Sequence, residues 1–154
     1  MKALKVLLLA ASFSLLSLAT SQAQVIRIAD DNGGLIGPYA EKYRALAHTG
    51  QQVIIDGPCL SACTLVTGLI PRDRICVTRR AKLGFHAAWR PDQDGHAVHS
   101  KAGTQILMDT YPQNIRRWIT RRGGLTPKMM YLEGRQLAQM YHACPTLEQR
   151  TASR

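Results

Sequence analysis

The alternation of strand-like and helix-like segments is the feature of this sequence that most constrains its fold. Apolar or β-branched runs predict strands at residues 25–29, 52–56, 74–78 and 81–86, the last of which could also continue the one before it. Apolar residues at helical spacing predict helices at residues 35–48, 61–68 and 102–122. Strands that alternate with helices are joined by right-handed crossovers into a mainly parallel sheet, so we expect an α/β domain.

Prolines divide the second half of the chain. Pro112 is expected to kink or split the helix predicted at residues 102–122. Thr126 and Pro127 are expected to begin a last short helix, with Thr126 as its N-cap. Residues 91–95 are expected to form a polar loop. After the strand-like segments, the sequence therefore predicts C-terminal helices.

The first 23 residues are expected to be a secretory signal peptide and not part of the folded domain. Lys2 and Lys5 precede an apolar run over residues 6–18, and residues 21–23 fit a cleavage site with small side chains at both critical positions. The apolar run is too short to span a bilayer comfortably, and no second such run follows it. A buried N-terminal helix is the alternative interpretation. The pattern predicts a periplasmic or secreted protein without a transmembrane segment in the mature chain.

Cleavage near Ala23 would leave one domain, which we place at residues 24–147, and a polar tail at residues 148–154. A chain of the remaining 131 residues can bury roughly two thirds of its unfolded surface, enough for one core. Loss of Lys2 and Lys5 lowers the Lys and Arg count from 20 to 18 against 10 acids, which leaves a charge of +8 with His neutral. That charge favours anionic partners such as lipids or envelope polymers, whereas export disfavours nucleic acid.

The four cysteines are Cys59, Cys63, Cys76 and Cys144. An even number of cysteines in an exported protein indicates disulfides, but three complete pairings are possible and the sequence does not choose among them. Their spacing contains no C-x-x-C pair, so a zinc site is not predicted. The alternative is that some of them are small buried apolar residues.

Ser61 is the first candidate for a chemical role. The buried strand predicted at residues 52–56 ends, Gly57 and Pro58 turn the chain, and Ser61 then lies in or near the first turn of a helix. This arrangement presents a hydroxyl at the carboxyl end of a strand and beside the free N–H groups of a helix start, which suits a developing oxyanion. The alternative is that Ser61 only caps the helix, because serine is a preferred N-cap.

Two further motifs accompany Ser61. Gly33 and Gly34 follow one predicted strand and precede a helix, so their backbone can approach a ligand closely. Leu83-Gly84-Phe85-His86 places His86 at the end of an apolar strand. A single histidine in such a position can also be purely structural.

In this order, these three motifs resemble the Clp protease proteolytic subunit and its periplasmic relatives, in the Clp/crotonase superfamily. Gly34 and Ser61 are separated by 27 residues and Ser61 and His86 by 25, close to the separations in that family. The resemblance covers residues 25–86 and extends more weakly to Ala143. It implies an α/β fold of the Clp/crotonase type, a ββα spiral that is truncated at the N-terminus, with a mainly parallel sheet and C-terminal helices. It also implies a homo-oligomer.

The resemblance assigns a role to each motif. Ser61 would be the nucleophile and His86 the general base, and the backbone N–H groups of Gly34 and Ala62 would form the oxyanion hole. A protein with these residues would be a serine hydrolase of the peptidase or esterase type, which transfers an acyl group from a peptide or ester and needs no cofactor or metal. A crotonase-type enzyme acting on acyl thioesters is a weaker alternative, because coenzyme A thioesters are cytosolic.

Two departures from the family pattern leave the activity open. Only one short strand precedes the glycines, where the family has a further βα unit. The family's catalytic aspartate aligns with Met129, and Glu133 is the nearest acid that could replace it; Asp92 and Asp94 are no better placed. A slow Ser–His dyad is one alternative, and a catalytically inactive envelope binding or scaffold protein with a basic surface is another.

The loop after residue 91 contains the other residues that could bind a metal. His96 and His99 are three residues apart, with Asp92 and Asp94 nearby. Because side chains in a non-helical loop need not converge, we interpret them as a solvated loop and predict no metal site.

Overall fold

The structure is a computed structural model that describes residues 24–145. The predicted signal peptide, the end of the predicted domain at residue 147 and the predicted polar tail lie outside the described residues. The described chain is a mixed α/β domain with a mainly parallel sheet, as the alternating segments predict.

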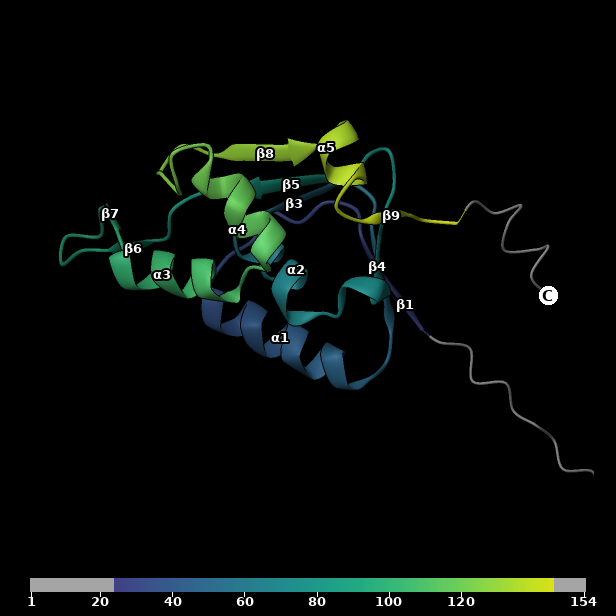
Figure 1. Ribbon diagram of the computed structural model, residues 1–154. Coiled ribbons are helices and arrows are strands. Elements are labelled where there is room, and N and C mark those ends of the chain that lie inside the picture. Colours follow the sequence, from purple (N-terminus) through teal and green to yellow (C-terminus); the bar gives the residue numbers. More distant parts are fainter. Residues whose placement is uncertain (1–23, 146–154) are drawn as a thin grey trace, which may run out of the picture.

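The larger sheet is entirely parallel. Its four strands, in spatial order, are β1 (Val25–Ile28), β2 (Gln52–Ile55), β4 (Ile75–Val77) and β9 (His142–Ala143). Helix α1 (Ile36–His48) connects β1 to β2, and Figure 1 shows it along the side of the molecule opposite to β8. Its buried face carries Ala40, Tyr43 and Leu46, which follow helical spacing.

The second sheet has three strands. It contains β3 (Pro58–Leu60), β5 (Lys82–Phe85) and β8 (Met130–Glu133), with β3 parallel and β8 antiparallel to β5. Only two residues separate β2 from β3, so the predicted break at Gly57 is a bend between two strands. A side chain could not be accommodated there, because a Cβ atom on Gly57 would lie 1.9 Å from the carbonyl oxygen of Ala29.

The remaining elements surround the two sheets. A 3-10 helix η1 (Ser61–Leu65) leads directly into α2 (Val66–Leu69), and η2 (Arg72–Arg74) precedes β4. The hairpin of β6 (Trp89–Pro91) and β7 (Ala97–His99) extends from one side of the molecule (Figure 1). Helices α3 (Lys101–Thr110), α4 (Gln113–Thr120) and α5 (Gly134–Ala138) follow. Pro112 is the N-cap of α4, so the predicted helix over residues 102–122 is divided in two.

The prediction of a last helix that begins at Thr126 is wrong. Thr126 does not cap a helix, because the chain there enters β8, whose residues pair with β5. The prediction of a polar loop at residues 91–95 is confirmed: residues 92–96 form the turn at the tip of the β6–β7 hairpin. Strand β9 is an element that the sequence did not predict. Short strands of this kind depend on pairing partners far away in the sequence, so local patterns are weak guides to them.

An aromatic cluster holds the helices α3 and α4 against the second sheet. Phe85 contacts Tyr111 edge-on with ring centroids 5.2 Å apart, and it contacts Trp118 with centroids 5.8 Å apart. All three side chains are buried, and large aromatic side chains contribute much of the apolar area of a core. Because Phe85 precedes His86, this packing fixes the position at which the histidine leaves the strand.

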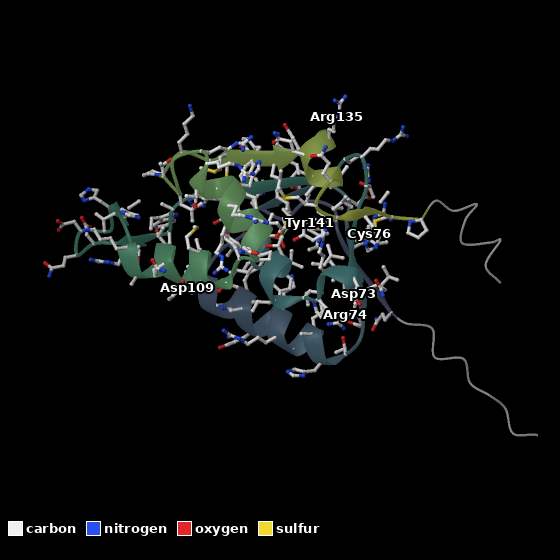
Figure 2. All side chains as sticks on the ribbon, viewed as in Figure 1. Asp73, Arg74, Cys76, Asp109, Arg135 and Tyr141 are labelled. Carbon is white, nitrogen blue, oxygen red and sulfur yellow. A yellow bond between two sulfur atoms is a disulfide. The ribbon has the colours of Figure 1, made fainter. Side chains whose placement is uncertain are left out.

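Two disulfides connect the four cysteines, as Cys59–Cys63 and Cys76–Cys144. Cys76, in β4, pairs with His142 of β9, the residue after Tyr141 (Figure 2). The even number of cysteines therefore reflects disulfides, and the structure supplies the pairing that the sequence leaves open. Within residues 24–145, none of the helices combines the length and the apolar character that crossing a membrane requires.

Candidate active site

Ser61 and His86 are in hydrogen-bond contact. The Nε2 atom of His86 lies 2.8 Å from the Oγ atom of Ser61. Each residue directly follows a strand, Ser61 after β3 and His86 after β5, and these two strands are parallel neighbours in which Leu60 pairs with Gly84. The carboxyl ends of adjacent parallel strands meet at one edge of the sheet, which is where sites commonly lie in α/β proteins.

The backbone of Ser61 has an unusual conformation. Its φ angle is +55°, and no other residue except glycine has a positive φ among residues 24–145. This left-handed region is unfavourable for a residue with a side chain, at a cost on the order of 1–3 kcal/mol, and such strain persists only where the surrounding structure imposes it. Ser61 is not the N-cap of η1; that position belongs to Leu60, and the Ser61 hydroxyl contacts His86 instead.

Thr64 and Tyr111 hold the strained residue from the helix side. The Thr64 hydroxyl donates a hydrogen bond to the carbonyl oxygen of Ser61 at 2.6 Å, and its oxygen lies 2.7 Å from the hydroxyl of Tyr111. Both Thr64 and Tyr111 are buried, and burial raises the pKa of Tyr111 to about 12. The Tyr111 hydroxyl therefore keeps its proton at neutral pH.

The backbone carbonyl of Ala87 fixes the orientation of the His86 ring. Nδ1 of His86 lies 2.7 Å from that carbonyl oxygen, which can only accept a hydrogen bond. Nδ1 must therefore carry the proton, which leaves Nε2 of the neutral ring free to accept the hydroxyl proton of Ser61. The Ala87 backbone is itself held, because its N–H donates to the carbonyl oxygen of Thr126 at 2.7 Å.

Glu133, the acid suggested as the third catalytic residue, does not reach the His86 ring. Glu133 pairs in register with Lys82, and its carboxylate lies 3.3 Å from the Lys82 ammonium. Lys82 begins β5 and His86 follows its end, and four residues of strand span roughly 13 Å. Met129, which the resemblance aligns with a catalytic aspartate, lies near Gly84: a Cβ atom on Gly84 would be 2.9 Å from the Met129 sulfur.

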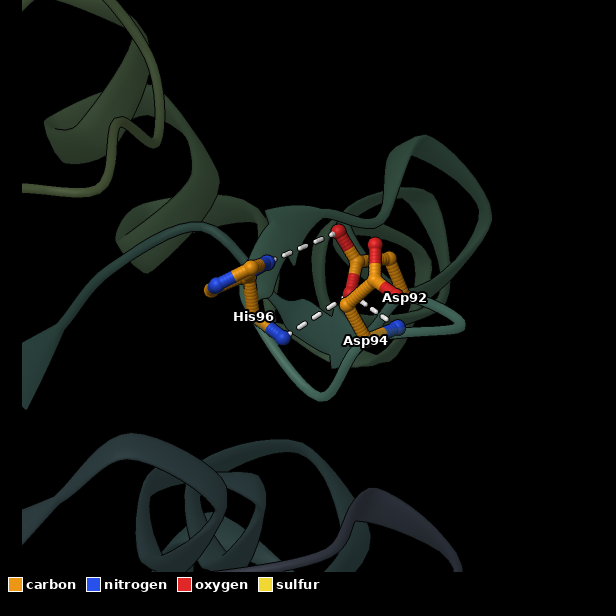
Figure 3. Close-up of side chains that lie close together, drawn as sticks. All are labelled: Asp92, Asp94 and His96. Carbon is orange, nitrogen blue, oxygen red and sulfur yellow. Dashed lines mark hydrogen bonds and ion pairs between the residues drawn. The ribbon is translucent and has the colours of Figure 1, made fainter.

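The other candidate acids are in the tip of the β6–β7 hairpin (Figure 3). Asp92 accepts hydrogen bonds from the backbone N–H groups of Asp94, at 3.0 Å, and of His96, at 2.8 Å. Its other oxygen lies 3.6 Å from Nδ1 of the His96 ring. The possible ligand atoms of Asp92, Asp94 and His96 lie within 4.8 Å of one another, but the hydrogen bonds of an Asx turn account for this arrangement. His99 contacts Thr104 instead, with Nε2 lying 3.0 Å from the hydroxyl oxygen.

The glycine loop, residues 31–35, lies directly against Ser61. A Cβ atom on Gly33 would be 2.4 Å from the carbonyl oxygen of Leu60 and 2.8 Å from the backbone nitrogen of Ala62, and the φ angle of Gly33 is +80°. Only glycine fits this position without displacing the backbone beside Ser61. The two predicted motifs, the glycines and the serine, are therefore brought together.

Asp31 anchors the glycine loop. Its carboxylate accepts hydrogen bonds from the Gly33 N–H, at 2.9 Å, and from the Tyr39 hydroxyl. Burial, followed by the bond to Asp31, raises the pKa of Tyr39 to about 12, so the hydroxyl remains a donor at neutral pH. The backbone of Asp31 also bridges to Cys59, in β3.

Gly34 and Ala62 are the two residues predicted to supply oxyanion-hole N–H groups, and neither N–H donates to an acceptor within residues 24–145. The Gly33 N–H is occupied by Asp31, whereas that of Gly34 donates to no acceptor within residues 24–145. Ala62 lies in the first turn of η1, where N–H groups have no partner inside the helix. A Cβ atom on Gly33 would lie 2.7 Å from the Cβ atom of Ser61 and 2.8 Å from the Ala62 nitrogen, so the glycine loop and the Ala62 N–H lie beside the serine.

A pocket of about 150 Å³ adjoins His86. Apart from the imidazoles of His86 and His99, its lining is apolar and consists of Ala87, Ala88, Trp89, Ala97 and Pro127. Trp89 is 60 % exposed although it is a large apolar side chain, which is common at binding surfaces. The β6–β7 hairpin thus supplies one wall of a small apolar space beside the Ser61–His86 pair.

Sequence reasoning missed three contributors to the site. Asp31 stands two residues before Gly33, which is the spacing of an Asx turn, and Thr64 stands three residues after Ser61, within reach of its carbonyl. Both signals were present in the sequence. The carbonyl of Ala87 leaves no such trace, because every residue has one.

Comparisons with known proteins add no family to this geometry. No family model matches the sequence, and no curated protein matches it either.

Proposed function

We propose that this protein is an exported serine hydrolase of the peptidase or esterase type. The observation that carries this proposal is the hydrogen bond of 2.8 Å between Ser61 Oγ and His86 Nε2. It involves a neutral ring whose Nδ1 proton is held by the Ala87 carbonyl. A strained serine, a base in the correct tautomer and free backbone N–H groups are the parts that acyl transfer requires.

The reaction would proceed through an acyl-enzyme. The Oγ atom of Ser61 attacks the substrate carbonyl carbon while His86 Nε2 takes the hydroxyl proton, and the oxyanion binds to the N–H groups of Gly34 and Ala62. The tetrahedral intermediate collapses, and the leaving group departs with the proton from His86. Water then attacks the ester on Ser61 with His86 again as base, which releases the acid and restores the hydroxyl.

The Ala87 carbonyl replaces only one of the two functions that the catalytic aspartate has in a serine hydrolase. It selects the tautomer and the orientation of His86, but it carries no negative charge to stabilise the imidazolium that forms during attack. In a serine protease, an aspartate-to-asparagine change that gives the wrong tautomer costs about 10⁴ in rate. We expect a smaller loss here, because the tautomer is correct, and hence a slow enzyme with measurable turnover.

The order of elements supports a ββα spiral of the Clp/crotonase type. Strand β2 of the first sheet and strand β3 of the second are followed by the helices η1 and α2. In the same way, β4 of the first sheet and β5 of the second are followed, after the β6–β7 hairpin, by helix α3. The first unit is shorter: β1 is followed only by the bridge at Asp31 before α1. This likeness is an argument from fold, and the assignment of activity depends on the site. Whether the protein forms the homo-oligomer that the resemblance implies stays a prediction.

The two disulfides support an oxidising compartment, the periplasm or the outside of the cell. The pocket beside His86 is lined mostly by alanine, tryptophan and proline, which supports a substrate that places a small apolar group near the histidine. No cofactor is needed for this chemistry.

A fluorophosphonate probe tests the proposal, because it reacts with activated serines. The protein should be labelled, Ser61→Ala should abolish labelling, and His86→Ala should slow it strongly. Ser100→Ala and His48→Ala are the matched controls: Ser100 caps α3, His48 ends α1, and both should leave the labelling rate unchanged. Equal labelling of the wild-type and Ser61→Ala proteins would remove Ser61 as the nucleophile.

A basic stripe on α4 favours a second candidate function, binding of an anionic envelope polymer or lipid surface. A shallow groove of about 360 Å³ is lined by Gln113, Arg116, Arg117, Thr120 and Arg121. The three arginines are exposed and form no ion pair within residues 24–145. Arginine binds phosphate and carboxylate groups through two parallel hydrogen bonds, so this face suits such a partner.

Sedimentation with vesicles that contain phosphatidylglycerol tests the stripe. The variant Arg116→Gln/Arg117→Gln/Arg121→Gln should lose salt-sensitive binding. A control with the same charge change at exposed arginines elsewhere is Arg44→Gln/Arg79→Gln/Arg135→Gln. Equal losses in the two variants would show that only net charge matters and would remove the α4 face as a specific surface.

A further inference from the structure

The Cys59–Cys63 disulfide encloses Ser61. The two cysteines stand two residues before and two residues after the serine, and their Cα atoms are 5.3 Å apart. Cys59 belongs to β3 and pairs with Leu83 of β5, the strand that leads to His86, and Cys63 belongs to η1. The bond therefore joins the strand before Ser61 to the helix after it, across the strained residue.

The ends of this short bridge are held by the surrounding core. Cys59 and Cys63 are both fully buried, Cys59 also bridges to Asp31, and the Tyr43 hydroxyl of α1 lies 3.6 Å from the sulfur of Cys63. The left-handed conformation of Ser61 is unfavourable by itself. Without the covalent link, the chain between the two cysteines can relax to a negative φ, which would turn the serine side chain away from His86.

The second disulfide has a different place in the fold. Cys76 and Cys144 are 68 residues apart and join β4 to the segment after β9, whereas Cys59 and Cys63 are only 4 apart. A link that closes a long loop restricts the unfolded chain more than a link that closes a short one. The Cys76–Cys144 disulfide therefore has the larger expected effect on global stability, and the Cys59–Cys63 disulfide acts mainly on the local bend.

We propose that the Cys59–Cys63 disulfide is a positioning device that holds Ser61 in its reactive conformation, so that the hydrolase is activated when this bond forms. This inference rests on the proposed function. Formation of the bond removes two protons and two electrons from the two thiols and passes them to an oxidised disulfide of another protein or small molecule, which becomes a dithiol. The reduced chain reacts far more slowly, so hydrolysis is largely confined to the oxidising compartment.

Two paired substitutions in the mature chain separate the roles of the disulfides. Cys59→Ala/Cys63→Ala should lower the rate of fluorophosphonate labelling per folded molecule by about 100-fold, the size of effect expected from a displacement of about 1 Å at a reacting atom. Its thermal midpoint should fall, because a short loop and two buried side chains are lost, but by less than that of the long-loop variant Cys76→Ala/Cys144→Ala. Cys76→Ala/Cys144→Ala should lower the thermal midpoint more but leave the labelling rate of the folded fraction unchanged. Labelling of Cys59→Ala/Cys63→Ala at the wild-type rate would overturn the proposal.

A second readout keeps the test independent of turnover. The ¹⁵N chemical shift of His86 Nε2 reports its hydrogen bond to Ser61, and the three-bond amide-to-Hα coupling of Ser61 reports φ. Both should change in Cys59→Ala/Cys63→Ala and stay constant in Cys76→Ala/Cys144→Ala. If the wild-type protein is not labelled but both signals change, the proposed function fails and the positioning role stands. Unchanged signals contradict the positioning role whatever the activity.

A third variant serves in case Cys59→Ala/Cys63→Ala does not fold. Cys59→Val/Cys63→Ala removes the bond but restores more of the buried volume at Cys59. It should fold and show the same slow labelling as Cys59→Ala/Cys63→Ala. If neither variant folds, the disulfide is required for the fold as a whole and the proposed local role is wrong.

Discussion

The backbone carbonyl of Ala87 accepts a hydrogen bond from Nδ1 of His86 at 2.7 Å, on the side of the ring opposite to Ser61. A neutral group thus stands where serine hydrolases usually have a carboxylate. It directs Nε2 at the Ser61 hydroxyl but adds no negative charge, so the ring has the required tautomer without a carboxylate beside it.

Glu133 should be dispensable for hydrolysis. Its carboxylate pairs with Lys82 on the surface, where Glu133 is 52 % and Lys82 35 % exposed. The variant Glu133→Gln should keep the wild-type labelling rate and lose less than about 1 kcal/mol of unfolding free energy, as exposed ion pairs do. Labelling kinetics and chemical denaturation measure the two quantities. A large fall in labelling at unchanged stability would place Glu133 in the mechanism.

Thr64 should affect both stability and reactivity, because it connects Tyr111 to the carbonyl of Ser61. The variant Thr64→Val should lose about 1–3 kcal/mol of unfolding free energy, the cost of leaving buried groups without partners, and should also be labelled more slowly. Thr67→Val is the control, since Thr67 is buried and donates to the carbonyl of Thr64 at 2.8 Å without touching Ser61. Its labelling rate per folded molecule should stay at the wild-type value. Equal effects on labelling in both variants would argue against a specific link to Ser61.

Gly33 should tolerate no side chain. Its φ is +80°, and an added Cβ would lie 2.4 Å from the Leu60 carbonyl oxygen, beside Ser61. Gly95 has a similar φ of +85° but nothing within 4 Å of the added atom, so Gly95→Ala isolates the backbone cost, about 1 kcal/mol. Gly33→Ala should destabilise the protein more than that and abolish labelling of the folded fraction. If the two variants had the same stability and reactivity, the close approach of the glycine loop to Ser61 would be contradicted.

Asp56 should dominate the acid sensitivity of the fold. Hydrogen bonds from Arg80 and Thr78, and the nearby Arg27, hold the pKa of the buried Asp56 carboxyl well below its usual value of about 4. Because the pKa is lowered by folding, its contribution to stability is present above about pH 4 and is lost as the pH falls below that value.

The thermal midpoint measured from pH 7 to pH 2 tests this expectation for Asp56. The wild-type midpoint should fall below about pH 4, whereas Asp56→Asn should be less stable at pH 7 and show a shallower fall. Asp109→Asn, at an exposed position on α3, serves as the control and should follow the wild-type curve. Parallel curves for the wild type and Asp56→Asn would contradict the assignment.

The sequence was informative wherever the signal was local. The apolar runs predicted β1, β2, β4 and β5 because buried strands need apolar residues, and Pro112 predicted the division of the helix because it cannot continue one. Ser61 could be selected because it follows a predicted strand and turn at the start of a helix, and His86 because it ends an apolar strand. Their contact depends on the parallel pairing of β5 with β3, a three-residue strand that the sequence did not predict.

The features that the sequence did not predict depend on contacts between residues far apart in the chain, or on backbone groups alone. β8 is a four-residue strand whose place is set by β5, and the pairing of Cys76 with Cys144 spans most of the domain. The contact of His86 with the carbonyl of Ala87 has no sequence signature, so the sequence suggests only acids, such as Glu133, as partners for the His86 ring. Backbone groups that replace side chains are invisible to reasoning from residue types.

The most direct test of the central claim is to locate the adduct formed by a fluorophosphonate on the native protein. Intact mass and peptide mapping should show one adduct, on Ser61, that is absent after unfolding and absent from Ser61→Ala. No adduct on Ser61 of the folded, disulfide-bonded protein, or equal modification of Ser61 and Ser100, would contradict the assignment of Ser61 and His86 as a catalytic pair.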